Sequence, residues 1–241
     1  MKKGIICLLI LTLLLSCTYG FAEEEKKEIL FRGIPWGSTI EDYITSIGSD
    51  KLSGSTSNIR NIYSWEIKEG KDMDESVQRI EDGGYQVSTY PKEFSVAGVP
   101  VENIYAYFMF TYDNDGVYTD DDKGSLYKAE YQLQPVDIGE AYSILTEKLT
   151  GLYGKGEKAH GTQKYINTTY TDNYEAVTWE GANNTGVRLF VQYREEAGTK
   201  EYKKLSIVYG KTNSVDLFAK LSEAMAREQK KQMLTDNNDG L

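Results

Sequence analysis

Apolar residues spaced three and four positions apart predict a first helix after residue 38. Ser38 and Glu41 have the spacing of a capping box, in which the hydroxyl and the carboxylate bind free amide groups at a helix start. Gly48 is suited to end this helix in a left-handed turn. The apolar stripe between them consists of Ile40, Tyr43, Ile44 and Ile47.

Two further helices are predicted by the same spacing. Asp137 and Glu140 repeat the capping pattern before the second helix, and Gly154 closes it. The third helix begins at Asn213 or Ser214 and turns polar in its last part, which is expected to project or fray. The apolar residues that make the second helix amphipathic are Ile138, Ala141, Tyr142, Leu145, Leu149 and Leu152, and the expected buried stripe of the third helix is Leu217, Phe218, Leu221, Ala224 and Met225.

Alternating apolar and polar residues predict strands over much of the remaining chain. Residues 104–110 are apolar on both sides, which is typical of a central strand, whereas residues 127–133 alternate as in a half-buried antiparallel strand. Strands are also expected over 63–67, 85–90, 94–97, 176–180, 187–193 and 204–209. Loops and turns are expected over 49–62, 68–84, 181–186, 195–201, the acidic hairpin 113–122 and the segment around His160.

The order of these elements is a helix then strands, again a helix then strands, and a closing helix. This order predicts an α+β fold in which helices pack on one side of an antiparallel sheet. Two tandem helix-plus-strands units over 29–134 and 135–235 fit it. Outside them we expect a signal peptide over 1–22, a flexible charged leader over 23–28 and a disordered tail over 236–241.

The N-terminus has the layout of a bacterial export signal. Two lysines precede an unbroken apolar run over residues 5–15, which is too short to span a membrane, and small residues follow. Two processing routes fit: cleavage after Ala22, and lipidation of Cys17 in a lipobox-like sequence. The first fits better because Leu15 is larger than the usual lipobox residue. We therefore expect a protein that is secreted or anchored on the outer face of the bacterial membrane.

Composition narrows the class of partner. The 241 residues carry a formal net charge of −10, which disfavours nucleic acid because phosphate binding needs clustered Lys and Arg. The hydrophobic fraction of 40% is enough for a core. Both cysteines, Cys7 and Cys17, lie at or before the cleavage region, so the mature domain is expected to lack disulfides.

The sequence contains few signals of catalysis or metal binding. His160 is the single histidine, and no Gly-x-Ser-x-Gly elbow accompanies it. Calcium binding by Asp113, Asp115 and residues 120–122 is an alternative to a solvated hairpin, although the EF-hand spacing is not met. No glycine-rich phosphate loop is present, so a nucleotide cofactor is not indicated. One histidine and no cysteine in the mature chain disfavour zinc, and we expect no cofactor, no metal and no enzyme. A carboxylate-dependent hydrolase is the enzyme alternative.

Aromatic residues are the most suggestive feature for binding. The chain has 19 tyrosines, and tyrosine offers a large contact area at a small entropy loss. The alternative is that tyrosines are simply common in strands and partly buried there. Trp36, Trp65 and Trp179 are expected in the core. The candidate binding face consists of Tyr105, Tyr107, Tyr127 and Tyr131.

Two segments resemble a known type of exported domain. Residues 31–48 combine an aromatic-Gly entry with Trp36-Gly37, a capping residue and a short helix, and residues 141–154 resemble the helix found further along such chains. Together with the strand order, they are similar to uncharacterised secreted proteins of gut bacteria. They are more loosely similar to the family of β-lactamase inhibitor protein and the outer-membrane lipoprotein SmpA/OmlA. The resemblance implies a helix-plus-antiparallel-sheet unit and a non-catalytic role in binding, inhibition or envelope assembly.

These observations predict an exported binding module that docks a protein at the cell envelope through an aromatic sheet face. A binder of carbohydrate or cell-wall glycan is the main alternative, because flat aromatic rings also bind sugars. A structural domain without a specific ligand is a further alternative. The sequence leaves the oligomeric state open.

Overall fold

Antiparallel strands form one curved sheet in the computed structural model, which describes residues 26–47, 53–63, 79–91, 94–119, 124–164, 171–212 and 214–236. The strand order is β1-β2-β4-β7-β11-β10-β9-β8, and β3 pairs with β4 beside this order. β5 and β6 form a separate two-stranded hairpin. The structure thus confirms a mixed α+β class with antiparallel sheet.

The elements follow the chain as a helix and strands, a helix and strands, and a helix. The helices are α2 (Ile40–Ile47), α4 (Ile138–Tyr153) and α5 (Ser214–Asp236). The strands are β1 (Ser53–Tyr63), β2 (Arg79–Tyr90), β3 (Ser95–Val96), β4 (Val99–Met109), β5 (Thr111–Tyr112), β6 (Tyr118–Thr119), β7 (Ser125–Leu133), β8 (Glu157–Lys164), β9 (Thr171–Glu180), β10 (Thr185–Glu196) and β11 (Thr199–Lys211).

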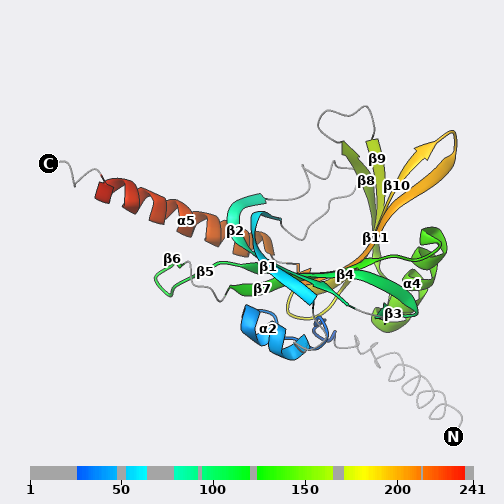
Figure 1. The fold of residues 1–241 in the computed structure, drawn as a ribbon, viewed down its shortest axis with the longest axis horizontal. Helices are drawn as coiled ribbons and strands as arrows, with labels where there is room; N and C mark the ends of the chain where they lie inside the picture. The colour runs from blue at the N-terminus through cyan, green and yellow to red at the C-terminus, as the bar shows by residue number, and fades with distance from the viewer. Residues whose placement is uncertain are drawn as a thin grey trace, which may run out of the picture.

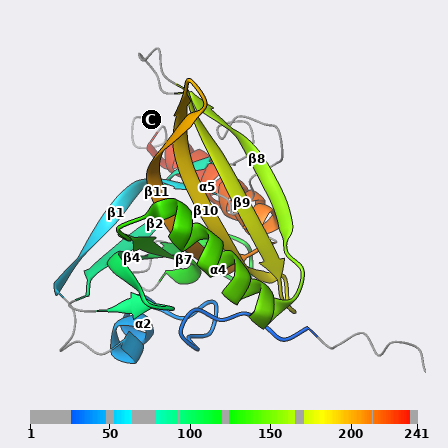
Figure 2. The same ribbon diagram turned by 90° about the vertical axis from the view of Figure 1, so that its right-hand side faces the viewer.

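One face of the sheet is apolar, and the other carries charged and polar side chains together with two smaller hydrophobic clusters, one beneath α5 and one of Tyr174, Ala176 and Phe190. It bends, so that β8, β9 and β10 rise steeply from the rest, and α2 and α4 lie on the outer side of the bend (Figures 1 and 2). We call the face under α2 and α4 the apolar face and the opposite side the polar face. Fully buried residues of the apolar face include Phe31, Tyr43, Ala106, Phe108, Ala129, Leu145, Trp179, Val187, Leu189, Leu205 and Ile207.

The cap of α2 differs by one residue from the prediction. Thr39 and Asp42 form the reciprocal pair: Asp42 N donates to Thr39 Oγ1 at 3.2 Å, and Thr39 N donates to Asp42 Oδ2 at 3.3 Å. Ser38 instead donates its hydroxyl to Pro35 O at 2.8 Å. The predicted Ser38–Glu41 box is therefore wrong, because Ser38 still belongs to the preceding turn, in which Gly37 has a φ of +89°.

The second and third helices are confirmed. Asp137 caps α4 by accepting a hydrogen bond from Glu140 N at 2.8 Å, and Gly154 follows its last residue with a φ of +80°. α5 begins at Ser214, and Phe218 and Leu221 on its apolar stripe are buried.

The edges of the sheet were not anticipated. Residues 53–63 form β1 where a loop was expected, and β2 begins at residue 79, inside the second expected loop. His160 lies in β8 and not in a loop. β1 and β8 stand at the two ends of the strand order, where one neighbour is enough and the sequence can stay polar. The expected strand over 63–67 lies almost wholly outside the described residues.

A bulge between β4 and β7 reverses the direction of Tyr127 relative to the simple alternation expected over residues 127–133. In the pairing of β4 with β7, Tyr107 faces Lys128 whereas Phe108 faces Leu126, so Tyr127 is the extra residue. Tyr127 therefore packs with Met109 on the polar face, while Leu126 points to the apolar face. The expected single row of Tyr127, Ala129, Tyr131 and Leu133 is broken at its first member.

The leader is part of the fold from residue 26. Glu28 forms a parallel bridge with Ala182, and Ile29 N donates to Thr185 Oγ1 at 2.8 Å. Trp36 is partly buried and donates its ring N–H to Ile29 O at 2.9 Å, whereas Trp179 is fully buried. Trp65 lies outside the described residues. These contacts tie the N-terminal segment to the β9–β10 turn.

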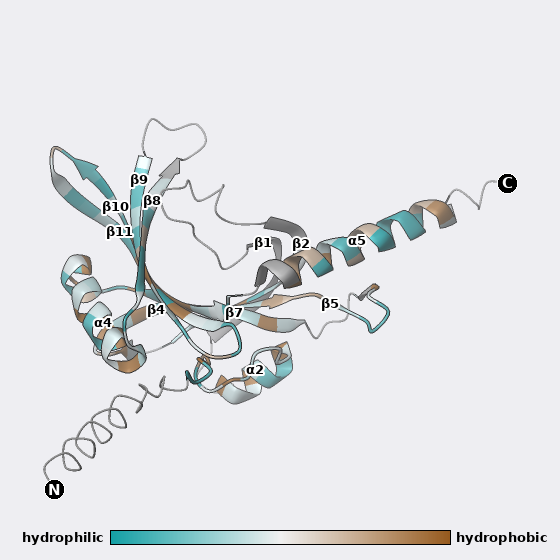
Figure 3. Ribbon diagram, turned by 180° about the vertical axis from the view of Figure 1, so that it is seen from behind, coloured by the Kyte–Doolittle hydropathy of each residue, from teal (hydrophilic) through white to brown (hydrophobic). Residues whose placement is uncertain are grey.

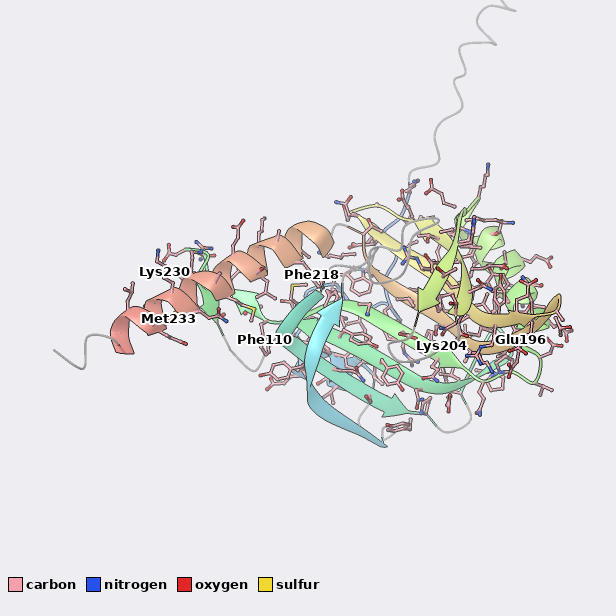
Figure 4. All side chains as sticks on the ribbon, turned by 90° about the horizontal axis from the view of Figure 1, so that it is seen from above. Phe110, Glu196, Lys204, Phe218, Lys230 and Met233 are labelled. Atoms are coloured by element: carbon pink, nitrogen blue, oxygen red, sulfur yellow. The ribbon has the colours of Figure 1, made fainter. Side chains whose placement is uncertain are left out.

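α5 is held at its first turns and projects at its end. Phe218 and Leu221 pack against Met109, Phe110 and Tyr127 on the polar face. The helix then leaves the body, and Met233 near its far end is 66% exposed (Figures 3 and 4). Among the described residues, no helix is both long and apolar enough to cross a membrane.

Candidate functional site

The polar face carries a row of side chains that crosses the middle of the sheet. Tyr105 on β4 pairs with Glu130 on β7, and Glu130 pairs with Val208 on β11. Val208 pairs with Arg188 on β10, which pairs with Thr178 on β9. Directly paired residues of antiparallel strands point to the same face, so these five side chains lie side by side.

Glu130 is the centre of an ionic cluster on this face. It is 7% exposed, and its Oε1 accepts a hydrogen bond from Ser206 Oγ at 2.7 Å. The same oxygen lies 2.8 Å from Lys204 Nζ. Because a buried charge is stable only with charged or hydrogen-bonded neighbours, these contacts hold Glu130 as a carboxylate. We call Lys128, Glu130, Arg188, Lys204 and Ser206 the ionic cluster.

The pKa of Glu130 shows which effect dominates at its carboxyl group. Burial alone would favour the protonated form. Lys204 and Lys128 nearby and the hydrogen bonds from Lys204 and Ser206 outweigh this effect, so the pKa of Glu130 lies below its ordinary value. Glu130 is therefore negative at neutral pH.

Lys128 occupies a less favourable position in the ionic cluster. Its Nζ lies 4.0 Å from the centre of the Tyr107 ring, a cation–π contact with a neutral group. Burial lowers the pKa of Lys128 from 10.5 to about 8; Glu130 opposes this change, and Lys204 and Arg188 add to it by repulsion. The surroundings of Lys128 therefore disfavour its positive charge relative to a lysine in water.

Arg188 and Tyr107 complete the surroundings of the ionic cluster. Arg188 is 7% exposed and donates its Nε–H to Thr178 Oγ1 at 3.0 Å. Burial and the carboxylate of Glu130 raise the pKa of Tyr107, which stays a neutral phenol. The Lys204 side chain is 38% exposed and Tyr105 is partly exposed, so the ionic cluster can be reached from outside at these residues. Figure 4 shows Lys204 on the sheet, away from the α5 contact at Phe110 and Phe218.

The structure brings together three of the four tyrosines of the predicted binding face, because the ring centres of Tyr107 and Tyr127 also lie 6.5 Å apart. The rings of Tyr105 and Tyr107 lie 6.5 Å apart on the polar face, beside the ionic cluster. Tyr127 shares this face but is 2% exposed, because Phe218 of α5 covers it at 5.7 Å. Tyr131 lies on the apolar face, 5.0 Å from Phe31.

The other candidate residues lie apart from the ionic cluster. His160 is exposed on the edge strand β8. Asp113 accepts a hydrogen bond from Val117 N at 2.7 Å and shapes the β5–β6 turn, as the hairpin interpretation predicts. Asp115 is exposed in that turn, and residues 120–122, like Cys17, lie outside the described residues.

The chemistry of the ionic cluster suits an anion better than a metal ion. Lysine and arginine donate hydrogen bonds and carry positive charge, whereas metal ions need carboxylate, imidazole or thiolate ligands. Within the described ranges, no group of three or more His, Cys, Asp or Glu residues is placed to hold a metal ion.

Comparisons with known proteins add no identity. They found no matching family model, no matching curated protein and no matching solved structure. The resemblance to the β-lactamase inhibitor protein family and to secreted gut-bacterial proteins therefore stays a prediction.

Sequence reasoning missed the ionic cluster for a simple reason. Lys128 and Glu130 occupy the polar positions of β7, which predict a solvent-facing side. Ser206 contacts Glu130 across 76 positions of sequence, and this contact exists because β11 pairs with β7. The available signal was two strands with charged or hydroxyl residues at alternate positions, but the sequence does not say that they are neighbours.

Proposed function

We propose that this protein is an exported binding module that docks a partner protein at the bacterial cell envelope. The polar face of the sheet between α5 and the β10–β11 hairpin is the docking surface. The signal-peptide pattern at the N-terminus supports export. The absence of a catalytic motif in the sequence supports a binding role.

The observation that carries this proposal is the ionic cluster beside Tyr105 and Tyr107. Burial disfavours the charge of Lys128, so an uncharged residue at this position would give a more stable fold. Residues that lower the stability of the fold are typical of functional sites. Tyrosine rings next to partly buried cations are also typical of the energetically important centre of a protein interface.

We also propose that the fold consists of two tandem units joined at this surface. In the strand order, β1-β2-β4-β7 follow α2, β8-β9-β10-β11 follow α4, and the last strands of the two runs pair with each other. Four members of the ionic cluster lie on these two joining strands: Lys128, Glu130, Lys204 and Ser206. The docking surface would then arise from the junction, which neither unit has alone.

Affinity capture with matched variants tests the docking function. The exported protein is immobilised, exposed to solubilised envelope of its own organism, crosslinked and analysed for retained proteins. Tyr105→Ala removes an aromatic ring of the polar face, and Tyr153→Ala removes a tyrosine that is 37% exposed on α4, which packs on the other face. We expect a stoichiometric protein that is retained by the wild type and by Tyr153→Ala but lost by Tyr105→Ala.

Two results would contradict the proposal. Equal retention by both variants would exclude the polar face as the docking surface. Retention of wall glycan without any protein would favour the carbohydrate alternative.

A further inference from the structure

One side of α4 carries a row of exposed residues that is not used for packing on the sheet. The helix packs on the sheet through Ala141, Leu145 and Leu149, which are buried. The exposed row consists of Glu140, Ile144, Lys148 and Leu152, which follow one another at intervals of four and are therefore neighbours on the helix surface. We call these four residues the α4 ridge. α4 lies in front of the sheet in Figure 2, with its outer side uncovered by the other described elements.

The apolar side chains of the α4 ridge are aligned and not scattered. Ile144 is 39% exposed and Leu152 is 73% exposed, and Val136 is fully exposed just before the helix cap. Single exposed apolar residues are common on protein surfaces, whereas an aligned set is typical of a contact surface. Rows of residues four apart are also the ridges that interlock when two helices pack in their commonest arrangement.

The sequence of the α4 ridge is complementary to itself. When two copies of the row run in opposite directions about a two-fold axis at Ile144, Glu140 lies opposite Lys148 of the partner subunit. Leu152 lies opposite Val136 of the partner subunit, and Ile144 lies opposite its own copy. An isologous contact between identical subunits requires such symmetry, because the same residues serve both sides. A contact with an unrelated protein does not require it.

The overall charge of the chain makes the charge pairs in this arrangement important. Each copy has a formal charge of −10, so two copies repel each other at long range. An apolar contact alone would have to overcome this repulsion. The α4 ridge offsets part of it, because each dimer contains two pairs of opposite charge and no like charges of the ridge meet.

We propose that two copies of this protein associate through the α4 ridge, antiparallel about a two-fold axis at Ile144. Ile144 and Leu152 form the apolar part of the contact, and Glu140 pairs with Lys148 of the partner subunit on both sides of the axis. α4 packs on the apolar face, so the contact leaves the polar face of each copy free (Figure 2). The inference therefore goes beyond the proposed docking function and does not depend on it.

Charge exchange within the α4 ridge gives the sharpest variants. Glu140→Lys or Lys148→Glu alone would place like charges opposite each other twice in the dimer, whereas both substitutions together restore two pairs of opposite charge. Ile144→Glu would place two negative charges at the two-fold axis. Thr150→Glu is the matched control, because Thr150 is exposed on α4 but does not belong to the ridge. All these positions are exposed, so the fold is expected to persist, and circular dichroism checks it.

Sedimentation velocity of the purified exported protein over a range of concentrations measures the association. We expect the wild type and Thr150→Glu to form a dimer whose share rises with concentration. Ile144→Glu and each single charge reversal should weaken the dimer at least about tenfold, because each brings like charges together. The double charge exchange should return its dissociation constant to within about threefold of the wild type.

Three results would overturn the inference. The first is a wild type that stays monomeric at every concentration, and the second is a dimer that Ile144→Glu leaves intact. The third is a double charge exchange that stays as weak as the single reversals, which would contradict the antiparallel pairing. The envelope capture is judged separately, since purified protein alone decides the association and Tyr105 lies on the other face of the sheet.

Discussion

Replacing Lys128 with methionine is expected to stabilise the folded protein. The pKa of Lys128 falls from 10.5 in a solvated chain to about 8 in the fold, chiefly because burial disfavours its charge. One pKa unit corresponds to about 1.4 kcal/mol, so the charge costs the fold about 3 kcal/mol at neutral pH. Methionine has a similar length and no charge. We expect a gain of up to about 3 kcal/mol in the free energy of unfolding at pH 7.

The gain must depend on pH in a defined direction. Between about pH 8 and pH 10.5 the unfolded chain keeps the Lys128 proton while the folded protein releases it. The unfolded state then binds more protons, so the wild type becomes more stable relative to the variant as the pH rises. The advantage of Lys128→Met is therefore complete below about pH 8 and disappears near pH 10.5.

Urea unfolding followed by tryptophan fluorescence measures this difference, because Trp179 is fully buried and reports on the core. Wild type, Lys128→Met and Lys203→Met are compared at pH 7 and at pH 10. Lys203→Met is expected to change stability by less than about 0.5 kcal/mol at both pH values, since its side chain is 34% exposed. A loss of stability in Lys128→Met at pH 7, or a gain that is equal at both pH values, would refute the argument from burial.

Two further predictions concern packing. Phe218→Ala is expected to destabilise the protein by about 3 to 5 kcal/mol and to speed hydrogen exchange in α5, because Phe218 is 1% exposed and attaches the helix to Tyr127. Met233→Ala, at a position that is 66% exposed, should change neither stability nor exchange. Unchanged exchange in Phe218→Ala would show that other contacts hold α5. Gly156→Ala is expected to lower the free energy of unfolding by about 1 to 3 kcal/mol, measured by heat or urea, because the added Cβ would lie 2.6 Å from Val177 Cγ1 and 2.8 Å from Trp179 Cε2. Gly151→Ala, inside α4 with nothing within 4 Å of its Cβ, should be neutral or stabilising. Equal effects of the two substitutions would contradict the close approach at Gly156.

The helices and central strands could be predicted from sequence because their signals are local. A helix that packs on a sheet must repeat its apolar residues every three or four positions, as α4 does from Ala141 to Leu149. A central strand must be apolar on the buried side, as β4 is at Ile104, Ala106 and Phe108. These periods follow from the backbone of a single element and need no knowledge of its neighbours.

The edge strands β1 and β8 escaped prediction because an edge strand is defined by its neighbour. Each lies at an end of the strand order and is held by backbone hydrogen bonds to one neighbour, a pairing that polar sequences can also make. The bulge at Tyr127 escaped for a related reason, since the extra residue exists only relative to β4.

The sequence by itself determined the apolar stripes, the α4 cap, the export signal pattern and the acidic net charge, because each depends on residues that are close together in the chain. Only the tertiary structure decided that Tyr131 lies on the apolar face while Tyr105 and Tyr107 lie on the polar face. It also decided that Lys204 meets Glu130, since the pairing of β7 with β11 joins segments more than 70 positions apart. The physical reason is that sheet pairing sets the distance between side chains on different strands, and a one-dimensional pattern contains no such distance.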